Sequence, residues 1–134
     1  MHHMNHMDEN MKSCIENCNE CRDECETMLF QHCLEAGGKH VEQTHVKLMA
    51  DCIEACQTAA HFMLRGSDNH ALYCNACAEI CEACADSCEK VSGREMEACA
   101  ETCRKCAETC RVMDSNNCIS QPRGNAKQNS MSAI

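Results

Sequence analysis

The sequence predicts an all-α protein, an antiparallel up-down-up-down four-helix bundle with a Cys-lined core. Cysteine and methionine recur at alternating spacings of three and four residues, short polar segments interrupt this repeat three times, and the 134 residues include only 1 Pro and 5 Gly. Spacings of three and four residues place side chains on one face of an α-helix. Short connections make consecutive helices antiparallel neighbours.

The repeat predicts helices at residues 8–35, 40–65, 68–90 and 93–117. The first two sulfur-rich stripes consist of Met7, Met11, Cys14, Cys18, Cys21, Cys25, Met28 and His32, and of His45, Met49, Cys52, Cys56, Ala59 and Met63. The other two consist of His70, Cys74, Cys77, Cys81, Cys84 and Cys88, and of Met96, Cys99, Cys103, Cys106, Cys110 and Met113. Cys33 lies off these stripes, and Cys118 follows the last one.

The segments between the stripes contain helix-ending and helix-starting residues. Glycines occur at residues 37–38 and in the segment 66–68, and Ser92 followed by Glu95 is typical of a capping box that opens a helix. The four helices therefore form one predicted domain. Its expected extent is residues 8–119, with residues 1–7 as a flexible His/Met-rich leader and residues 120–134 as a flexible polar tail.

The charge and residue pattern exclude several classes of function. A net charge of −9, with 12 scattered basic residues, argues against a nucleic-acid partner. No run of 18 uncharged apolar residues is present, so no membrane-spanning helix is predicted. No Ser/His/Asp set, phosphate loop or carboxylate pair is apparent, so we expect no catalytic residues and no enzyme. Without a visible secretory signal we expect a cytoplasmic protein, the alternative being the processed form of an exported one.

The core must be built largely from sulfur. The chain has 17 Cys and 10 Met, but only 16 Leu, Ile, Val and Phe together. Packing alone does not explain so many cysteines, because leucine fills a core better. A disulfide within a helix is also disfavoured, because Cβ atoms four residues apart are separated by about 5–6 Å and a disulfide needs about 3.5–4.5 Å. Disulfides between helices remain open, but metal binding explains the pattern better.

Sulfur ligands select soft metals, namely Cu(I), zinc or iron–sulfur clusters. Methionine thioethers favour Cu(I) over zinc, and one Cu(I) per buried thiolate leaves the core nearly neutral. The prediction is therefore storage of many Cu(I) ions, roughly one per thiol. A zinc or general soft-metal buffering and detoxification protein is the main alternative, followed by an iron–sulfur protein and a redox enzyme.

The candidate metal ligands are the cysteines together with methionines and histidines near the helix ends. The cysteines are Cys14, Cys18, Cys21, Cys25, Cys33, Cys52, Cys56, Cys74, Cys77, Cys81, Cys84, Cys88, Cys99, Cys103, Cys106, Cys110 and Cys118. The other ligands are Met28, His32, His40, His45, Met49, Met63 and Met96. In the predicted bundle, one mouth lies where the first helix ends, and it collects Met28, His32, Cys33, His40, His45, Met49 and Met96. We expect ions to pass there, because thioether and imidazole hold Cu(I) less tightly than thiolate.

Three segments resemble the bacterial copper storage protein (Csp) family: HCLEAGGKH (32–40), MADCIEACQTAAHFMLRGS (49–67) and YCNACAEICEACADSC (73–88). The resemblance extends over about residues 10–118. It implies a four-helix bundle, often a homotetramer, that binds many Cu(I) ions along its axis through cysteines in CxxxC pairs, seven of which occur here. Copper chaperones or chelators are the partners that this resemblance suggests.

Overall fold

The computed structural model describes the backbone of residues 8–120 and the side chains of residues 8–113. This part of the chain is helical and contains no strand. Its long helices are α1 (Glu9–Thr27), α3 (Gln43–Leu64), α4 (His70–Val91) and α5 (Arg94–Ser120). Three short helices lie between α1 and α3, namely η2 (Met28–Cys33), α2 (Leu34–Ala36) and η3 (Gly38–Val41). The predicted leader and residues 121–134 of the predicted tail lie outside the described residues.

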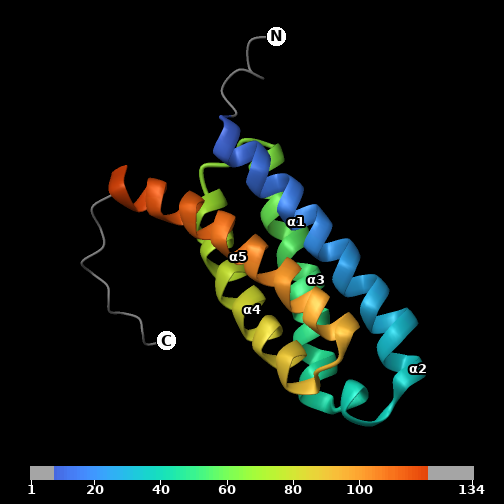
Figure 1. Ribbon diagram of the computed structural model, residues 1–134. Helices are drawn as coiled ribbons and strands as arrows, with labels where there is room; N and C mark the ends of the chain where they lie inside the picture. Colours follow the sequence, from blue (N-terminus) through green and yellow to red (C-terminus); the bar gives the residue numbers. More distant parts are fainter. Residues whose placement is uncertain (1–7, 121–134) are drawn as a thin grey trace.

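The long helices form the predicted antiparallel bundle. Helix α1 packs against α3 and α5, and α4 packs against the same two helices. Successive helices run in opposite directions, so α1 and α4 lie diagonally across the bundle (Figure 1). One end of the bundle is formed by η2, α2 and η3 with the start of α3, the end of α4 and the start of α5; we call it the η2 mouth. No helix within residues 8–120 is long and apolar enough to span a bilayer.

The first helix contains a change of register that the repeat does not predict. Residues 28–33 form a π-helix, which accommodates one more residue per turn than an α-helix. As a result, Leu29 and Cys33 follow Cys25 into the core, whereas Met28 and His32 are only half-buried. The prediction that Cys33 lies off the buried stripe was therefore wrong, and the places expected for Met28 and His32 are taken by their neighbours.

The boundary between α4 and α5 also differs from the prediction. Ser92 follows the last residue of α4 and has a φ of 67°, a left-handed conformation that turns the chain. The Glu97 N–H donates to the Gly93 carbonyl oxygen at 2.9 Å, so Gly93 occupies the cap position of α5. The expected capping box between Ser92 and Glu95 was therefore wrong, because the helix begins one residue later.

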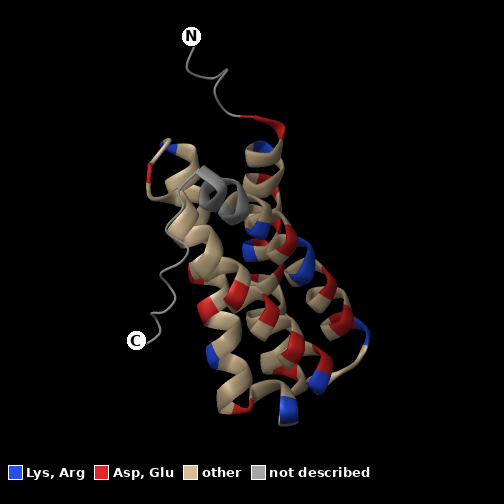
Figure 2. Cartoon of the chain, turned by 90° about the vertical axis from the view of Figure 1, so that its left-hand side faces the viewer, with Lys and Arg blue, Asp and Glu red and all other residues tan. Residues whose placement is uncertain are grey.

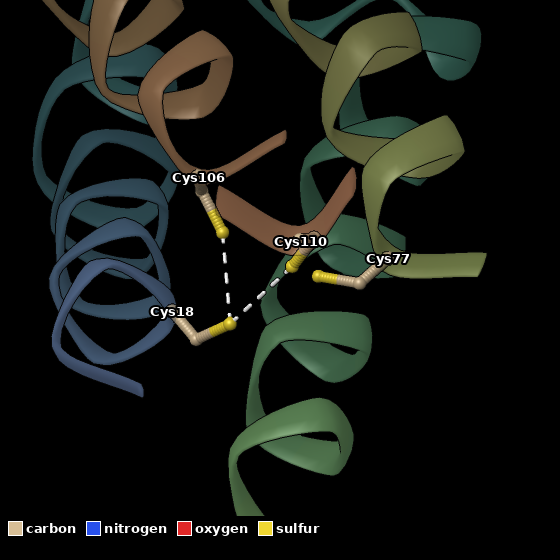
Figure 3. A group of neighbouring side chains, drawn as sticks. All are labelled: Cys18, Cys77, Cys106 and Cys110. Atoms are coloured by element: carbon tan, nitrogen blue, oxygen red, sulfur yellow. Dashed lines mark hydrogen bonds between the residues drawn. The ribbon is translucent and has the colours of Figure 1, made fainter. Parts of the chain in front are cut away.

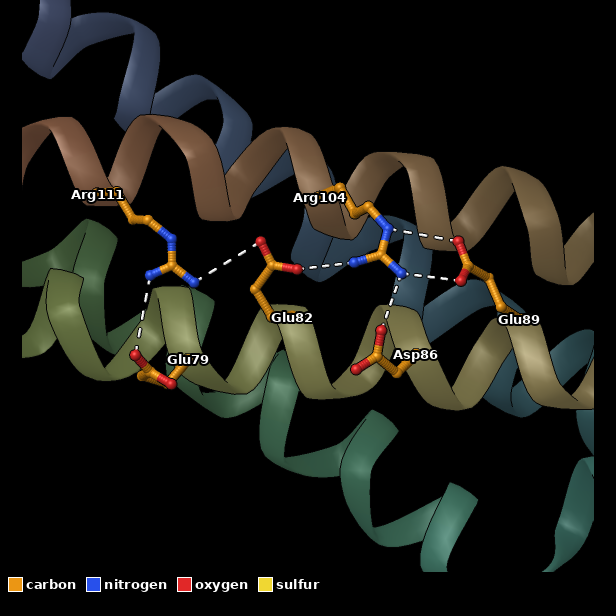
Figure 4. Close-up of polar contacts among 6 residues, drawn as sticks. All are labelled: Glu79, Glu82, Asp86, Glu89, Arg104 and Arg111. Carbon is orange, nitrogen blue, oxygen red and sulfur yellow. Dashed lines mark hydrogen bonds and ion pairs between the residues drawn. The ribbon is translucent and has the colours of Figure 1, made fainter.

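Charged residues cover the outer surface, with acidic side chains more frequent than basic ones (Figure 2). A network of ion pairs connects α4 and α5 (Figure 4). Arg104 contacts Glu82 at 2.7 Å, Glu89 at 2.9 Å and Asp86 at 3.0 Å, and Arg111 makes longer contacts to Glu79 and Glu82. Exposed pairs of this kind each contribute up to about 1 kcal/mol, so they support the packing rather than dominate it.

Candidate metal centre

The core of the bundle is a column of thiols. All sixteen cysteines whose side chains are described are free, and each is 0% exposed. Four come from α1, two from α3, five from α4, four from α5, and Cys33 comes from η2. The structure therefore brings together every predicted cysteine ligand except Cys118, whose side chain lies outside the described part.

One group of sulfur atoms lies in the half of the column nearest the η2 mouth. It consists of Cys21, Cys25, Cys52 and Cys103, whose Sγ atoms all lie within 4.8 Å of one another. Cys25 Sγ is 3.7 Å from Cys103 Sγ and 3.8 Å from Cys52 Sγ. Three helices contribute to this group, so it forms only when the bundle folds.

Three further groups continue the column toward the other end. Cys21 also belongs to a group with Cys56, Cys81 and Cys106. Cys106 belongs in turn to a group with Cys18, Cys77 and Cys110, and these side chains point toward one another from α1, α4 and α5 (Figure 3). The last group consists of Cys14, Cys74 and Cys110. Each group shares a cysteine with the next, so the sulfur atoms form a continuous ladder rather than separate tetrahedral sites.

The spacing within this ladder suits bridging metal ions. Neighbouring sulfur pairs along the column, which range from Cys14 with Cys110 at 3.6 Å to Cys52 with Cys103 at 4.0 Å, are far beyond the roughly 2.05 Å of a disulfide bond. An ion about 2.3 Å from each sulfur can connect two sulfur atoms up to about 4.6 Å apart. A soft monovalent ion could therefore sit between neighbouring thiolates with little movement of the helices.

The thiols influence one another's protonation. Burial raises the pKa of Cys33 to about 11, whereas hydrogen bonding with Cys103 lowers the pKa of Cys84 to about 7. Hydrogen bonding with Cys106 raises the pKa of Cys18, and hydrogen bonding with Cys103 lowers the pKa of Cys21. The buried thiols of the column therefore differ in how readily each loses its proton. Binding of a soft cation displaces the remaining protons.

The η2 mouth combines thiols with other soft donors. Met49 Sδ lies 3.6 Å from Cys84 Sγ and 3.7 Å from Cys88 Sγ. Cys33 Sγ lies 3.7 Å from His45 Nε2 and 4.0 Å from Met96 Sδ. These contacts are buried and lie on the mouth side of the group formed by Cys21, Cys25, Cys52 and Cys103, so they form the innermost layer of the mouth.

The remaining predicted ligands of this mouth lie nearer the surface. The rings of His32 and His40 pack edge to face with centroids 5.0 Å apart, and both residues are half-buried. His32 Nε2 is 3.9 Å from a carboxylate oxygen of Glu95. Met28 packs against the outside of the core. The structure therefore divides the predicted donors into a buried layer and an outer layer.

The opposite end of the bundle is closed mainly by methionines. Met63 and Met113 are 1% and 3% exposed, and Met11 packs against the core from α1. Met63 is one predicted ligand at this end, and Cys118, whose side chain lies outside the described residues, is the other. His70 is half-buried, and its Nδ1–H can donate to the Ser67 carbonyl oxygen at 2.9 Å. This end thus has fewer imidazoles close to thiols than the η2 mouth.

One polar residue of the site was missed by the sequence reasoning. Ser87 Oγ lies 2.8 Å from His45 Nδ1, on the opposite side of the ring from Cys33. Ser87 lies on α4 next to a buried stripe, and nothing in the sulfur spacing distinguishes it from other serines on the helix faces. Its contact arises only because α3 and α4 pack side by side.

Comparison with known proteins gives a consistent result. The family profile described as Csp, copper storage protein, matches residues 7–115. A crystal structure of a Nitrosospira multiformis protein is 53% identical, with a TM-score of 0.78, and the match covers 81% of this chain and 97% of that one. No curated protein matched the sequence.

Two further solved structures are copper storage proteins. The Cu(I)-bound copper storage protein BsCsp3 is 34% identical with a TM-score of 0.73, and the match covers 79% of this chain and 99% of that one. Apo copper storage protein 3 from Bacillus subtilis is 36% identical with a TM-score of 0.68, and the match covers 77% and 97%. Together with the thiol column and the four-helix bundle, these matches show that the chain belongs to the copper storage protein family.

Proposed function

We propose that the chain stores Cu(I) along the bundle axis, at roughly one ion per core thiol. The observation that carries this proposal is the continuous thiol ladder, in which neighbouring groups share Cys21, Cys106 and Cys110. A shared thiolate can bridge two ions, so the column can hold a chain of ions rather than a few isolated ones. The Cu(I) in the related BsCsp3 structure supports the same chemistry.

Charge favours Cu(I) over zinc as the stored ion. A buried thiolate is costly unless its charge is neutralised, and one Cu(I) per thiolate neutralises it. A Zn²⁺ ion bound by four thiolates leaves two negative charges at each site. The overlapping groups would also force zinc ions to compete for shared cysteines. The zinc or general buffering alternative therefore predicts a lower capacity than the copper proposal.

The η2 mouth is the proposed route for ions. Thioether and imidazole bind Cu(I) less tightly than thiolate, so a layer containing His45, Met49 and Met96 can accept an ion and release it again. This layer adjoins Cys33 and Cys84. Ions would move from mixed donors at the mouth to thiolates in the column.

Storage is the activity of this family, and we propose storage rather than catalysis for this chain, because its described thiols are all enclosed in the core. Three further points stay predictions from the sequence and the family resemblance. They are assembly as a homotetramer, exchange of copper with chaperones or chelators, and a cytoplasmic location.

The proposal is tested by anaerobic titration of the reduced protein with Cu(I) in the presence of a competing chelator, with bound metal counted. We expect tight uptake of roughly one ion per thiol. The same titration with Zn²⁺ serves as the comparison and should saturate at a few ions. Saturation with Cu(I) at one to four ions, or displacement of Cu(I) by zinc, would contradict storage in the column.

A further inference from the structure

His45 is held between two helices by polar contacts on opposite sides of its ring. Its Nδ1 lies 2.8 Å from Ser87 Oγ on α4, and its Nε2 lies 3.7 Å from Cys33 Sγ in η2. The residue is 2% exposed and, cysteines apart, it is the one buried polar or charged side chain among the described residues. Burial lowers the pKa of His45 and so favours the neutral imidazole, the form that binds metal ions.

A neutral imidazole carries one N–H and one free lone pair, and the two tautomers have different consequences here. With the proton on Nδ1, His45 donates to Ser87, and the Nε2 lone pair is directed at the space beside Cys33. With the proton on Nε2, the N–H is directed at Cys33, and the remaining lone pair, on Nδ1, faces Ser87 instead of the thiol. The hydrogen-bond partner of one ring nitrogen selects which nitrogen can bind metal.

Ser87 is well placed to act as the acceptor. Its hydroxyl lies at the wall of a groove of about 410 Å³ between α3 and α4, and Ser87 itself is half-buried. A serine hydroxyl can accept one hydrogen bond while donating its own proton elsewhere. Because one side of Ser87 faces this groove, it can donate to solvent while its oxygen accepts from His45 Nδ1.

We propose that Ser87 is a positioning residue that keeps His45 in the Nδ1–H tautomer, so that Nε2, Cys33 Sγ and Met96 Sδ form a three-donor site through which Cu(I) passes into the column. The inference rests on the proposed storage function and adds a residue that does not itself touch copper. One thiolate, one imidazole and one thioether around Cu(I) give a neutral site. Such a site holds the ion less tightly than the thiol groups below it, as transfer requires.

The first test reads the tautomer directly, by ¹⁵N NMR of the imidazole of His45 in the reduced apo protein. We expect the Nδ1–H form in the wild-type protein. In Ser87→Ala we expect the Nε2–H form to become populated, whereas Ser87→Thr, which keeps the hydroxyl, should retain the wild-type spectrum. Ser13→Ala, at an exposed position of α1, is the matched control for loss of a hydroxyl.

The second test follows Cu(I) uptake from a chelator complex by stopped flow, with total capacity measured separately. Loss of a residue that orients a metal ligand typically costs 10–100-fold in metal affinity or activity. We therefore expect uptake by Ser87→Ala to be slower by about 10-fold, capacity to be unchanged, and Ser87→Thr to restore the rate. His45→Ala should slow uptake similarly, and adding Ser87→Ala to it should have no further effect.

The inference and the storage function fail in different ways. An Nε2–H tautomer in the wild-type protein overturns the role of Ser87, even if the column binds many ions. Wild-type uptake kinetics in a folded Ser87→Ala variant overturn it as well. If the wild-type protein binds only a few ions, storage itself is wrong, and this is seen in the titration rather than in the NMR spectrum. If Ser87→Ala does not fold, the tautomer of His45 in the wild-type protein still tests the role of Ser87, and so do the NMR spectrum and the uptake rate of Ser87→Thr.

Discussion

A cysteine in the centre of a helical bundle contributes less to packing than the leucine that usually stands there, but it adds a metal ligand. Cys52 illustrates the difference. Its Sγ lies 3.7–4.0 Å from the sulfur atoms of Cys21, Cys25, Cys81 and Cys103. Leu29, in contrast, is a buried aliphatic residue of the same core without any ligand atom. The two positions should therefore separate metal capacity from stability.

We expect Cys52→Ala to lower Cu(I) capacity by one or two ions, because its sulfur has four close neighbours in the ladder. The free energy of unfolding should fall by about 1 kcal/mol, a typical value for a single substitution. Leu29→Ala should show the opposite pattern, a loss of about 2–5 kcal/mol through the cavity that it creates, with capacity unchanged. Metal counting and chemical denaturation of the reduced apo proteins measure both quantities. Equal capacity in Cys52→Ala would contradict the ladder.

At the scale of the helices, the sulfur repeat predicts the fold well and one segment poorly. Helices α3, α4 and α5 begin and end within three residues of their predicted bounds. Helix α1 begins one residue later than predicted and ends earlier, because the π-helix follows it. A π-helix accommodates a single additional residue, and no local pattern marks it. Met28 and His32 continue the alternation of three and four, whereas Leu29 and Cys33 break it, and both pairs include a soft donor. Only packing against the other helices selects Cys33.

The contact of Ser87 with His45 was unpredictable for a related reason. The spacing along one helix shows which residues share its face, but not which residue of the next helix lies opposite. The side-by-side packing of α3 and α4 determines that pairing. The thiol ladder was easier to predict, because its cysteines occupy all four stripes and some thiols must meet in any register.

The π-helix leads to a prediction about chain length. Leu29 and Cys33 follow Cys25 at spacings of four and four, and deletion of the exposed Thr27 changes these spacings to three and four. A regular α-helix would then keep both side chains in the core. We expect the deletion variant to fold, to bind as many Cu(I) ions as the wild type and to unfold at no lower temperature.

Deletion of Glu20, an exposed residue within α1, is the matched control. It shortens the spacing between Cys18 and Cys21 to two, so one part of the stripe must leave the core. Its capacity should fall by several ions or the protein should fail to fold. Thermal unfolding monitored by circular dichroism, together with metal counting, compares the two deletions. If the deletion of Thr27 were as damaging as that of Glu20, the π-helix would not be a single-residue insertion in the register.

At the scale of the whole molecule, we expect the bundle to fold before copper binds. Each thiol group combines residues from three or four helices. Contacts that involve no metal, such as the ion pairs of Arg104, also join α4 to α5. Small buried residues, Ala78, Ala85 and Ala107, lie beside the thiols on the same two helices. The helices therefore have metal-independent reasons to pack, and the related B. subtilis protein was solved in its apo form.

Copper should therefore stabilise a fold that is already present. Far-ultraviolet circular dichroism of the reduced apo protein should show the same helix content as that of the loaded protein. Ions that bind only the folded state stabilise it by mass action, by about 4 kcal/mol per site at a free concentration 1,000 times the Kd. For a domain of this size, occupancy of one such site raises the midpoint of thermal unfolding by at least about 10 °C, and further sites add to the shift. Zn²⁺ at equal concentration should raise it less, because fewer ions fit and each leaves negative charge in the core. An apo protein that gains its helices only when copper is added would show that the thiols are brought together by the metal and not by the packing of the bundle.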